Sequence, residues 1–162
     1  MKRYPLATLI RLREHRTHAA RQTVIHHQRV VADKRSACAQ IEQHIVALGE
    51  ERANQRCRLL DPPPAGMAWP IALAQREAHV ELLQHQEEIA RQQLLRARQI
   101  LAEAEAELQL ARDAFFRLKA REDALKKRHQ LWRDEQYAEE LRQEELATAD
   151  LLQGRNTSHA FH

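Results

Sequence analysis

The sequence predicts an all-α protein, a long two-helix antiparallel coiled-coil hairpin. Glycine and proline are scarce, with three and five occurrences in 162 residues, and neither occurs anywhere in 71–153. Four of the five prolines fall between Pro62 and Pro70. Apolar residues recur with a period of 3.5 on both sides of this break, the pattern of a coiled coil. We therefore expect one coiled-coil domain over 1–153 and a flexible tail over 154–162.

The first helix is predicted over 6–59 and the hinge over 60–69. Three successive prolines cannot occupy a helix interior, so Pro62 to Pro64 must follow the end of the helix. A mostly apolar heptad row runs along this segment: Ile10, Thr17, Val24, Val31, Cys38, Ile45, Arg52, Leu59. The row three residues later is mixed: Arg13, Ala20, His27, Lys34, Ile41, Leu48, Gln55. Both rows are expected to face the other helix.

The second helix is predicted over 70–152. Pro70 suits a first helical turn, where its missing N–H costs nothing, and Gly154 is a suitable stop. One heptad row is Leu73, Val80, Glu87, Leu94, Leu101, Leu108, Phe115, Glu122. The other row is Arg76, Leu83, Ala90, Ala97, Ala104, Ala111, Leu118, Leu125, Trp132. Four successive alanines in this row permit a close approach of the two helices.

The short connection between the helices predicts antiparallel pairing. Aligning Leu59 with Pro70 sets the register and places Ile45 opposite Gln84. The second helix then continues past the start of the first. Because residues 1–60 carry a net charge of +7 and residues 61–162 a net charge of −4, the two helices attract each other on average.

Several classes of protein are excluded by composition. No window holds the clustered glycines of a nucleotide-binding loop, and the regular turn signals of a β-fold are missing. No apolar run approaches the roughly 18 residues of a membrane span, and the N-terminus does not read as a secretory signal. Cys38 and Cys57 lie too far apart on one helix for a disulfide, and two lone thiols fit a reducing compartment. We expect a cytoplasmic protein without membrane insertion.

The sequence predicts no catalytic residue, no metal site and no cofactor. Ten histidines are present, but none stands in the spacing typical of zinc sites. Ser36 and Ser158 are the only serines, and neither cysteine lies in a known catalytic motif. We therefore expect a non-enzymatic protein without a small-molecule substrate.

Charge is distributed in blocks along the chain. Residues 2–35 carry a net charge of +7, residues 112–133 carry +5, and residues 134–150 carry −6. A hairpin brings the two basic stretches together, where they weaken the pairing unless a partner supplies acidic groups. We therefore expect an acidic partner to bind these residues: Arg11, Arg13, Arg16, Arg21, Arg112, Arg117, Lys119, Arg121.

Three segments carry a resemblance to a known family. They are the basic helix start over 6–14 (LATLIRLRE), the segment over 116–123 (FRLKARED) and the acidic stretch over 134–145 (DEQYAEELRQEE). With them the chain resembles the FliJ/YscO-type central stalk proteins of flagellar and type III secretion export systems. The acidic stretch is more similar to the injectisome members than to the flagellar ones, whereas the triple proline and the many histidines depart from the family pattern.

The resemblance implies a non-enzymatic stalk on the cytoplasmic side of the inner-membrane export machinery. Its terminal end would insert into the pore of a hexameric secretion ATPase, and other parts would contact the cytosolic domain of the export gate. For the injectisome members it also implies binding of secretion chaperones.

Two alternatives remain open. A passive coiled-coil scaffold or chaperone-binding adaptor could join chains through exposed residues of the second helix: Trp132, Leu141, Leu146. A nucleic-acid-binding coiled coil, favoured by the sequence pI of about 9.1, is the weaker alternative. No aromatic residues are interleaved with its basic ones, and the acidic stretch would repel phosphates.

Overall fold

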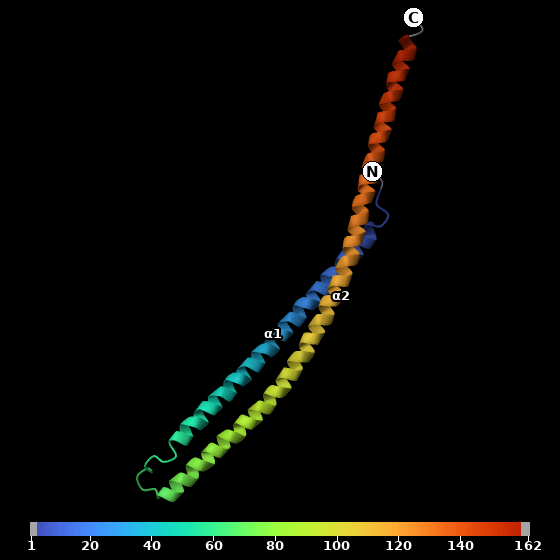
Figure 1. The fold of residues 1–162 in the computed structure, drawn as a ribbon. Helices are drawn as coiled ribbons and strands as arrows, with labels where there is room; N and C mark the ends of the chain where they lie inside the picture. The colour runs from blue at the N-terminus through green and yellow to red at the C-terminus, as the bar shows by residue number, and fades with distance from the viewer. Residues whose placement is uncertain (1–2, 160–162) are drawn as a thin grey trace. The chain divides into compact units, whose positions relative to one another are not determined.

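The structure, a computed structural model, describes residues 3–159 and their side chains as far as Arg155. It contains helix α1 (Ala7–Cys57, 51 residues) and helix α2 (Trp69–His159, 91 residues), joined by a connection over 58–68. The described part of the chain has no strand. The protein is therefore all-α, and its two helices form an antiparallel hairpin as the sequence predicts (Figure 1).

The helix ends differ from the predicted ones by a few residues. The connection begins at 58 instead of 60, and α2 continues past Leu152 as far as His159. The expected tail over 154–162 is thus helical through His159, and residues 160–162 lie outside the described residues. Gly154 does not take the left-handed conformation of a helix C-cap, because the one glycine described with a positive φ is Gly66.

The structure divides into two compact units. Unit 1 comprises Met1–Gln22 and Asp113–His162, and unit 2 comprises Thr23–Arg112. Each unit therefore contains one part of α1 and one part of α2. The contacts described below lie within one unit or the other.

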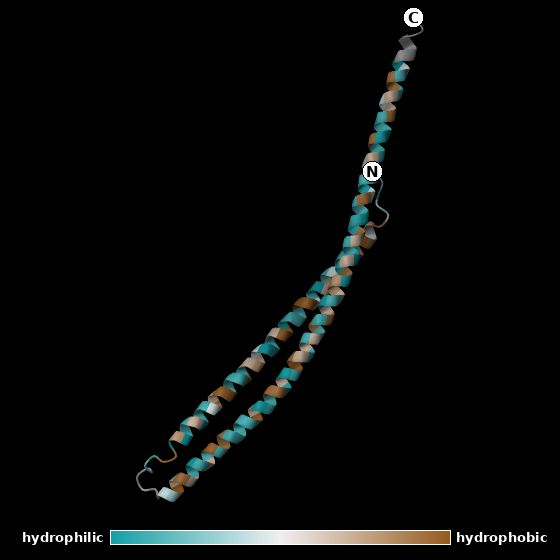
Figure 2. Ribbon diagram, viewed as in Figure 1, coloured by the Kyte–Doolittle hydropathy of each residue, from teal (hydrophilic) through white to brown (hydrophobic). Residues whose placement is uncertain are grey.

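Two apolar clusters hold the helices of unit 2 together. Val31 packs against Ala104 and Leu108, with Val24, Val30 and Leu101 around them. Leu48 packs against Leu83 and Ala90, with Ile45 beside them. Figure 2 shows hydrophobic residues recurring along both helices between hydrophilic ones, as a continuous seam requires. Burial of these side chains, at roughly 25 cal/mol per Å² of apolar surface, is the main stabilising contribution in this unit.

The predicted heptad rows face the other helix. In both units their members are buried or half-buried, and Lys34 is the one exposed member. Ala90 and Ala104 are 2% and 7% exposed, while Ala97 and Ala111 are half-buried. The small side chains therefore lie in the seam, which confirms the heptad frame.

The ion pairs between the helices show that the predicted register was wrong by about ten residues. Aligning Leu59 with Pro70 would place Arg52 opposite Glu77, yet Arg52 Nη1 lies 3.2 Å from Glu87 Oε2. In the same register Arg98 Nη2 lies 3.1 Å from Glu42 Oε1. The cause is the connection, which does not turn tightly at its ends, so that the start of α2 extends beyond the last turn of α1.

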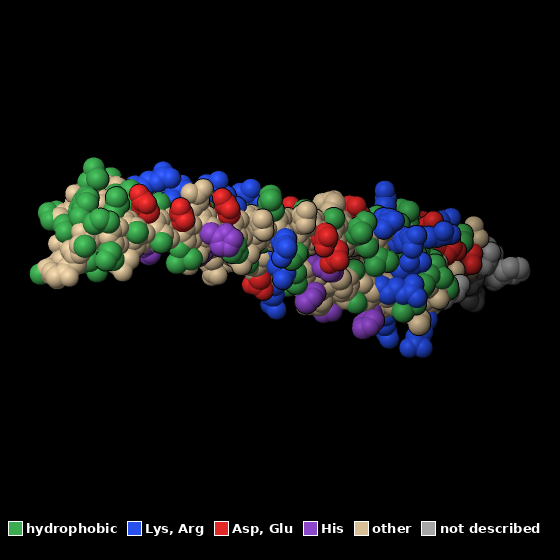
Figure 3. Space-filling view, turned by 90° about the horizontal axis from the view of Figure 1, so that it is seen from below, with side chains coloured by type: hydrophobic (Ala, Val, Ile, Leu, Met, Phe, Trp, Pro, Cys, Tyr) green, Lys and Arg blue, Asp and Glu red, His purple; other side chains and the backbone are tan. Residues whose placement is uncertain are grey.

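Arg76 of α2 holds this connection in place. Its guanidinium donates hydrogen bonds to the carbonyl oxygens of Arg58, Leu59, Asp61 and Pro62, at 3.3, 3.2, 2.6 and 3.2 Å. These carbonyls follow the end of α1, where helical backbone groups lack partners within the helix. Apart from Arg58 and Asp61, the side chains of the connection are apolar, and Figure 3 shows hydrophobic side chains gathered at one end of the molecule. Leu60 is 80% exposed.

Candidate functional site

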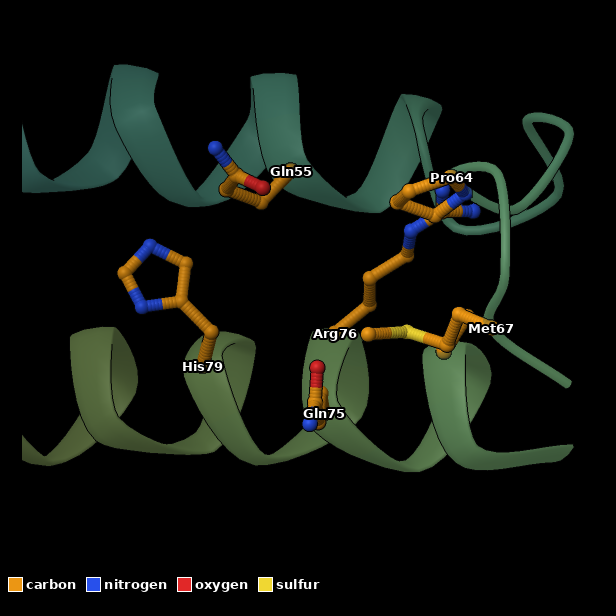
Figure 4. A pocket seen from close by; sticks show the side chains of 7 residues that line it. Gln55, Pro64, Met67, Gln75, Arg76 and His79 are labelled. Carbon is orange, nitrogen blue, oxygen red and sulfur yellow. The ribbon is translucent and has the colours of Figure 1, made fainter. Parts of the chain in front are cut away.

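The pockets in the described part of the chain are open ones. A small pocket of about 180 Å³ lies beside the connection, under the roughly 300–1,000 Å³ of typical ligand sites, and two others of about 410 Å³ each lie in unit 1. Figure 4 shows Gln55, Pro64, Met67 and His79 around the small pocket, with the guanidinium of Arg76 turned toward the connection. No group of three or more His, Cys, Asp or Glu side chains in the described residues is arranged to hold a metal ion.

The predicted basic surface is the remaining candidate site, and most of it lies in unit 1. Seven of its eight residues belong to this unit, while Arg112 is the last residue of unit 2 and is exposed. The two parts of unit 1 are in contact, since the guanidinium of Arg21 lies 5.5 Å from the centre of the Phe115 ring. The basic residues of α1 and α2 thus share one unit, with the exception of Arg112.

Four of these side chains are available to a partner. Arg11, Arg16, Arg117 and Arg121 are exposed, and none of them forms an ion pair within the described residues. Uncompensated, exposed guanidiniums are fully hydrated and can exchange water for an acidic partner at low cost. These four arginines are the candidate partner-binding site.

The other three basic side chains of unit 1 are engaged in the fold itself. Arg13 is half-buried, and its Nε is buried without a hydrogen-bond partner in the described part of the chain. Lys119 Nζ lies 3.6 Å from Glu122 Oε1 and 3.2 Å from Asp123 Oδ1. Arg21 lies over an aromatic ring. We therefore assign these three residues to the stability of unit 1 as well as to its charge.

A buried carboxylate organises the centre of unit 1. Glu122 is 5% exposed, and Lys126 Nζ lies 2.7 Å from its Oε1. The same ammonium lies 3.1 Å from Glu14 Oε1, so that one lysine joins α2 to α1. The hydrogen bond from Lys126, and to a smaller extent one with Thr17, hold the pKa of Glu122 below its ordinary value. The same two carboxylates raise the pKa of Lys126, Glu122 more than Glu14.

Unit 2 contains a second buried carboxylate. Glu87 is 5% exposed and lies between Arg52 Nη1, 3.2 Å from its Oε2, and Arg91 Nη2, 2.7 Å from its Oε1. The sequence analysis did not single out Glu87 or Glu122. The signal was present, because both occupy a heptad row that is otherwise apolar, and a carboxylate at such a position needs a buried partner.

Past its pairing with α1, α2 is mostly exposed. Every described side chain from 133 to 155 is exposed except Gln136, which is half-buried. Leu141 and Leu146 are 41% and 66% exposed, as the scaffold alternative requires. Trp132 was wrongly included there, since it is half-buried and its ring centre lies 5.1 Å from that of Tyr4.

Comparison with known proteins gives one strong match. The structure is similar to that of a proposed YscO homolog, CT670 of Chlamydia trachomatis, with a TM-score of 0.74. The match covers 98% of each chain at 19% sequence identity. This chain has a YscO/FliJ-type fold. The likeness extends along both helices of the YscO-type fold, which agrees with the resemblance drawn from the sequence.

The sequence comparisons do not add to this result. No family model matches the chain, and no curated protein matches it. No described helix of the chain is both long and apolar enough to cross a membrane.

Proposed function

We propose that this protein is the central stalk of a bacterial type III secretion export apparatus. Unit 1 inserts into the pore of the hexameric secretion ATPase, and other parts of the chain contact the cytosolic domain of the export gate. The YscO/FliJ-type fold supports this assignment. The observation that carries it is the presence of four exposed arginines in unit 1 without an ion pair in the described residues: Arg11, Arg16, Arg117, Arg121.

The chemistry of these arginines suits a stalk inside a ring. One copy that contacts several subunits in turn needs contacts that tolerate different neighbours, and exposed charge pairs have this property because their geometry is loose. The acidic groups of the pore compensate arginines that otherwise repel one another. The buried network around Glu122 keeps the two helices of unit 1 together while its surface changes partners.

The test is the rate of ATP hydrolysis by the purified secretion ATPase, with and without the stalk. Wild-type stalk is expected to raise the rate. The double reversal Arg16→Glu with Arg117→Glu is expected to weaken the response about tenfold or more, since both residues are exposed and leave the apolar seam intact. Binding should also weaken with salt, because the screening length falls from about 10 Å at 0.1 M to about 3 Å at 1 M.

A matched control is available in unit 2. Arg29 and Arg96 are also exposed and form no ion pair within the described residues, so Arg29→Glu with Arg96→Glu changes the net charge equally. This variant should stimulate the ATPase as wild type does. Equal stimulation by all three proteins would remove the pore-docking proposal, and tight, salt-dependent binding of wild type to duplex DNA would favour the nucleic-acid alternative.

A further inference from the structure

The exposed charges of α2 in unit 1 divide into two blocks of opposite sign. The seventeen residues of 117–133 carry a net charge of +5, and the seventeen residues of 134–150 carry −6. Five cations of the first block are exposed and form no ion pair within the described residues: Arg117, Arg121, Lys127, Arg128, Arg133. Six anions of the second block are in the same condition: Asp134, Glu135, Glu140, Glu144, Glu145, Asp150.

These two blocks are mirror images in their spacing. Reflecting the sequence about the boundary between 133 and 134 exchanges Arg117 with Asp150 and Lys127 with Glu140, because the two members of each pair are equally far from the boundary. The same reflection brings Arg121 to within one residue of Glu145. In an antiparallel pair of identical helices each residue lies level along the axis with its mirror position on the other chain, so the basic block of each chain runs beside the acidic block of its partner.

The exposed apolar side chains follow the same symmetry. Reflection brings Phe116 to within one residue of Leu152, and Leu131 to within one residue of Tyr137. All four are more than half exposed, at 64%, 58%, 56% and 65%. Apolar side chains at matching positions would be covered together in such a pair, which adds a non-electrostatic contribution to the association.

A groove lies at the centre of this symmetry. It is lined by residues from the start of the chain and from α2: Tyr4, Pro5, Leu6, Arg128, Leu131, Trp132, Glu135. Its members from α2 lie within six residues of the boundary between the blocks, where a second chain crosses. Tyr137 of that second chain would lie opposite Leu131 in the lining of the groove, so the groove offers a place for its ring.

We propose that unit 1 binds a second copy of this chain, antiparallel along α2, with the acidic block of each copy on the basic block of the other. This inference goes beyond the proposed function and does not depend on it. It has one consequence for that function: the dimer covers Arg117 and Arg121, so self-association and docking into an acidic pore exclude each other. The dimer is thus a resting form of the stalk.

Sedimentation equilibrium of the full chain, with no other protein present, tests the proposal. Wild type is expected to be a dimer at about 50 mM salt and to dissociate at about 500 mM. Reversal of one block, as in Arg117→Glu with Arg121→Glu, should raise the dimer dissociation constant about tenfold or more. Reversal of the facing residues of the other block, as in Glu145→Lys with Asp150→Lys, should do the same.

Mixing these two variants separates complementarity from general loss of structure. In the mixed pair every reversed block meets an oppositely reversed one, so the heterodimer should form with about the wild-type constant. Circular dichroism checks that each variant is as helical as wild type. A wild-type chain that is monomeric at every concentration tested, or a mixture that associates no better than its parts, would overturn the proposal.

The antiparallel geometry has its own readout. In a chain with Cys38→Ala and Cys57→Ser, single cysteines are introduced as Arg117→Cys or Asp150→Cys. The mixture of these two chains is expected to form a mixed disulfide, while each chain alone should not. A disulfide between two copies of the Arg117→Cys chain indicates a parallel pair and contradicts the proposed one.

Discussion

Lys126 Nζ lies 2.7 Å from Glu122 Oε1, a contact between an exposed ammonium and a carboxylate that is buried in the seam of unit 1. The pair is one helical turn apart on α2, and the same lysine also reaches Glu14 of α1. Glu122 occupies a heptad position that is otherwise apolar. Its ionised carboxylate holds the Lys126 ammonium, which in turn joins α2 to Glu14 of α1.

The stability of unit 1 should depend on pH through Glu122. Because the pKa of Glu122 in the folded protein lies below its ordinary value of 4.5, its contribution is complete above pH 4.5. The contribution is lost as the pH falls through the folded pKa. Glu122→Gln should therefore lower the melting temperature at pH 7, and the difference from wild type should shrink well below pH 4.5. A difference that stays constant down to acid pH would contradict this prediction.

Overpacking the seam of unit 2 should destabilise it. Ala104 is 7% exposed and packs against Val31 and Leu108, so Ala104→Leu must push the helices apart. We expect a loss of about 1–3 kcal/mol in the free energy of unfolding, measured by urea denaturation. Ala106→Leu is the control, since Ala106 is exposed on the same helix and has room for the larger side chain. Similar losses for both variants would show that the position in the seam does not matter.

Two glycines should respond to alanine in opposite directions. Gly49 lies inside α1 and a Cβ there meets no atom within 4 Å, so Gly49→Ala should stabilise the protein by about 0.5–1 kcal/mol. Gly66 in the connection has a φ of 85°, so Gly66→Ala should destabilise it by roughly 1–2 kcal/mol. Thermal denaturation followed by circular dichroism measures both. A stabilising Gly66→Ala would contradict the conformation of the connection.

The register of unit 2 can be measured directly with spin labels. Labels at 42 and 98 replace an ion pair of 3.1 Å and should lie close together. The alignment of Leu59 with Pro70 would place position 42 opposite 87, so labels at 42 and the adjacent position 88 test it. Position 88 lies about 15 Å along α2 from position 98. The distance between 42 and 98 should thus be the shorter of the two. The reverse order would restore the register predicted from the sequence.

The heptad pattern predicts which side chains are buried because burial repeats with the same period as the pattern. This is why Val31, Leu108 and the four alanines were placed in the seam correctly. The pattern cannot determine the register, since sliding one helix by seven residues leaves every row intact. The alignment depends on how far the connection extends, and thus on the contacts of Arg76 with four carbonyl oxygens, which have no signature in the periodicity.

The candidate site was predictable in part. Clustered basic residues can be counted in the sequence, but their availability depends on which of them find carboxylates in the fold. Arg117 finds none among the described residues, whereas Lys119 contacts Glu122 and Asp123. The mirror spacing of the charges on α2 was likewise present in the sequence. This spacing indicates a contact surface only because the structure leaves charged residues on both sides of 133 exposed.

The two buried carboxylates also have a consequence for how the chain folds. In unit 1 Glu122 meets Thr17, and in unit 2 Glu87 meets Arg52. The second pair lies thirty-five residues nearer the connection than the first on both helices, so both pairs belong to the same alignment. A slip of one heptad would place Glu122 opposite Val24 or Ile10, and Glu87 opposite Leu59 or Ile45. Lys126 and Arg91 lie on α2 and move with these carboxylates, but a slipped hairpin loses the contacts that α1 supplies from Thr17 and Arg52. A buried carboxylate that loses a partner costs free energy, so the correct alignment is favoured during folding.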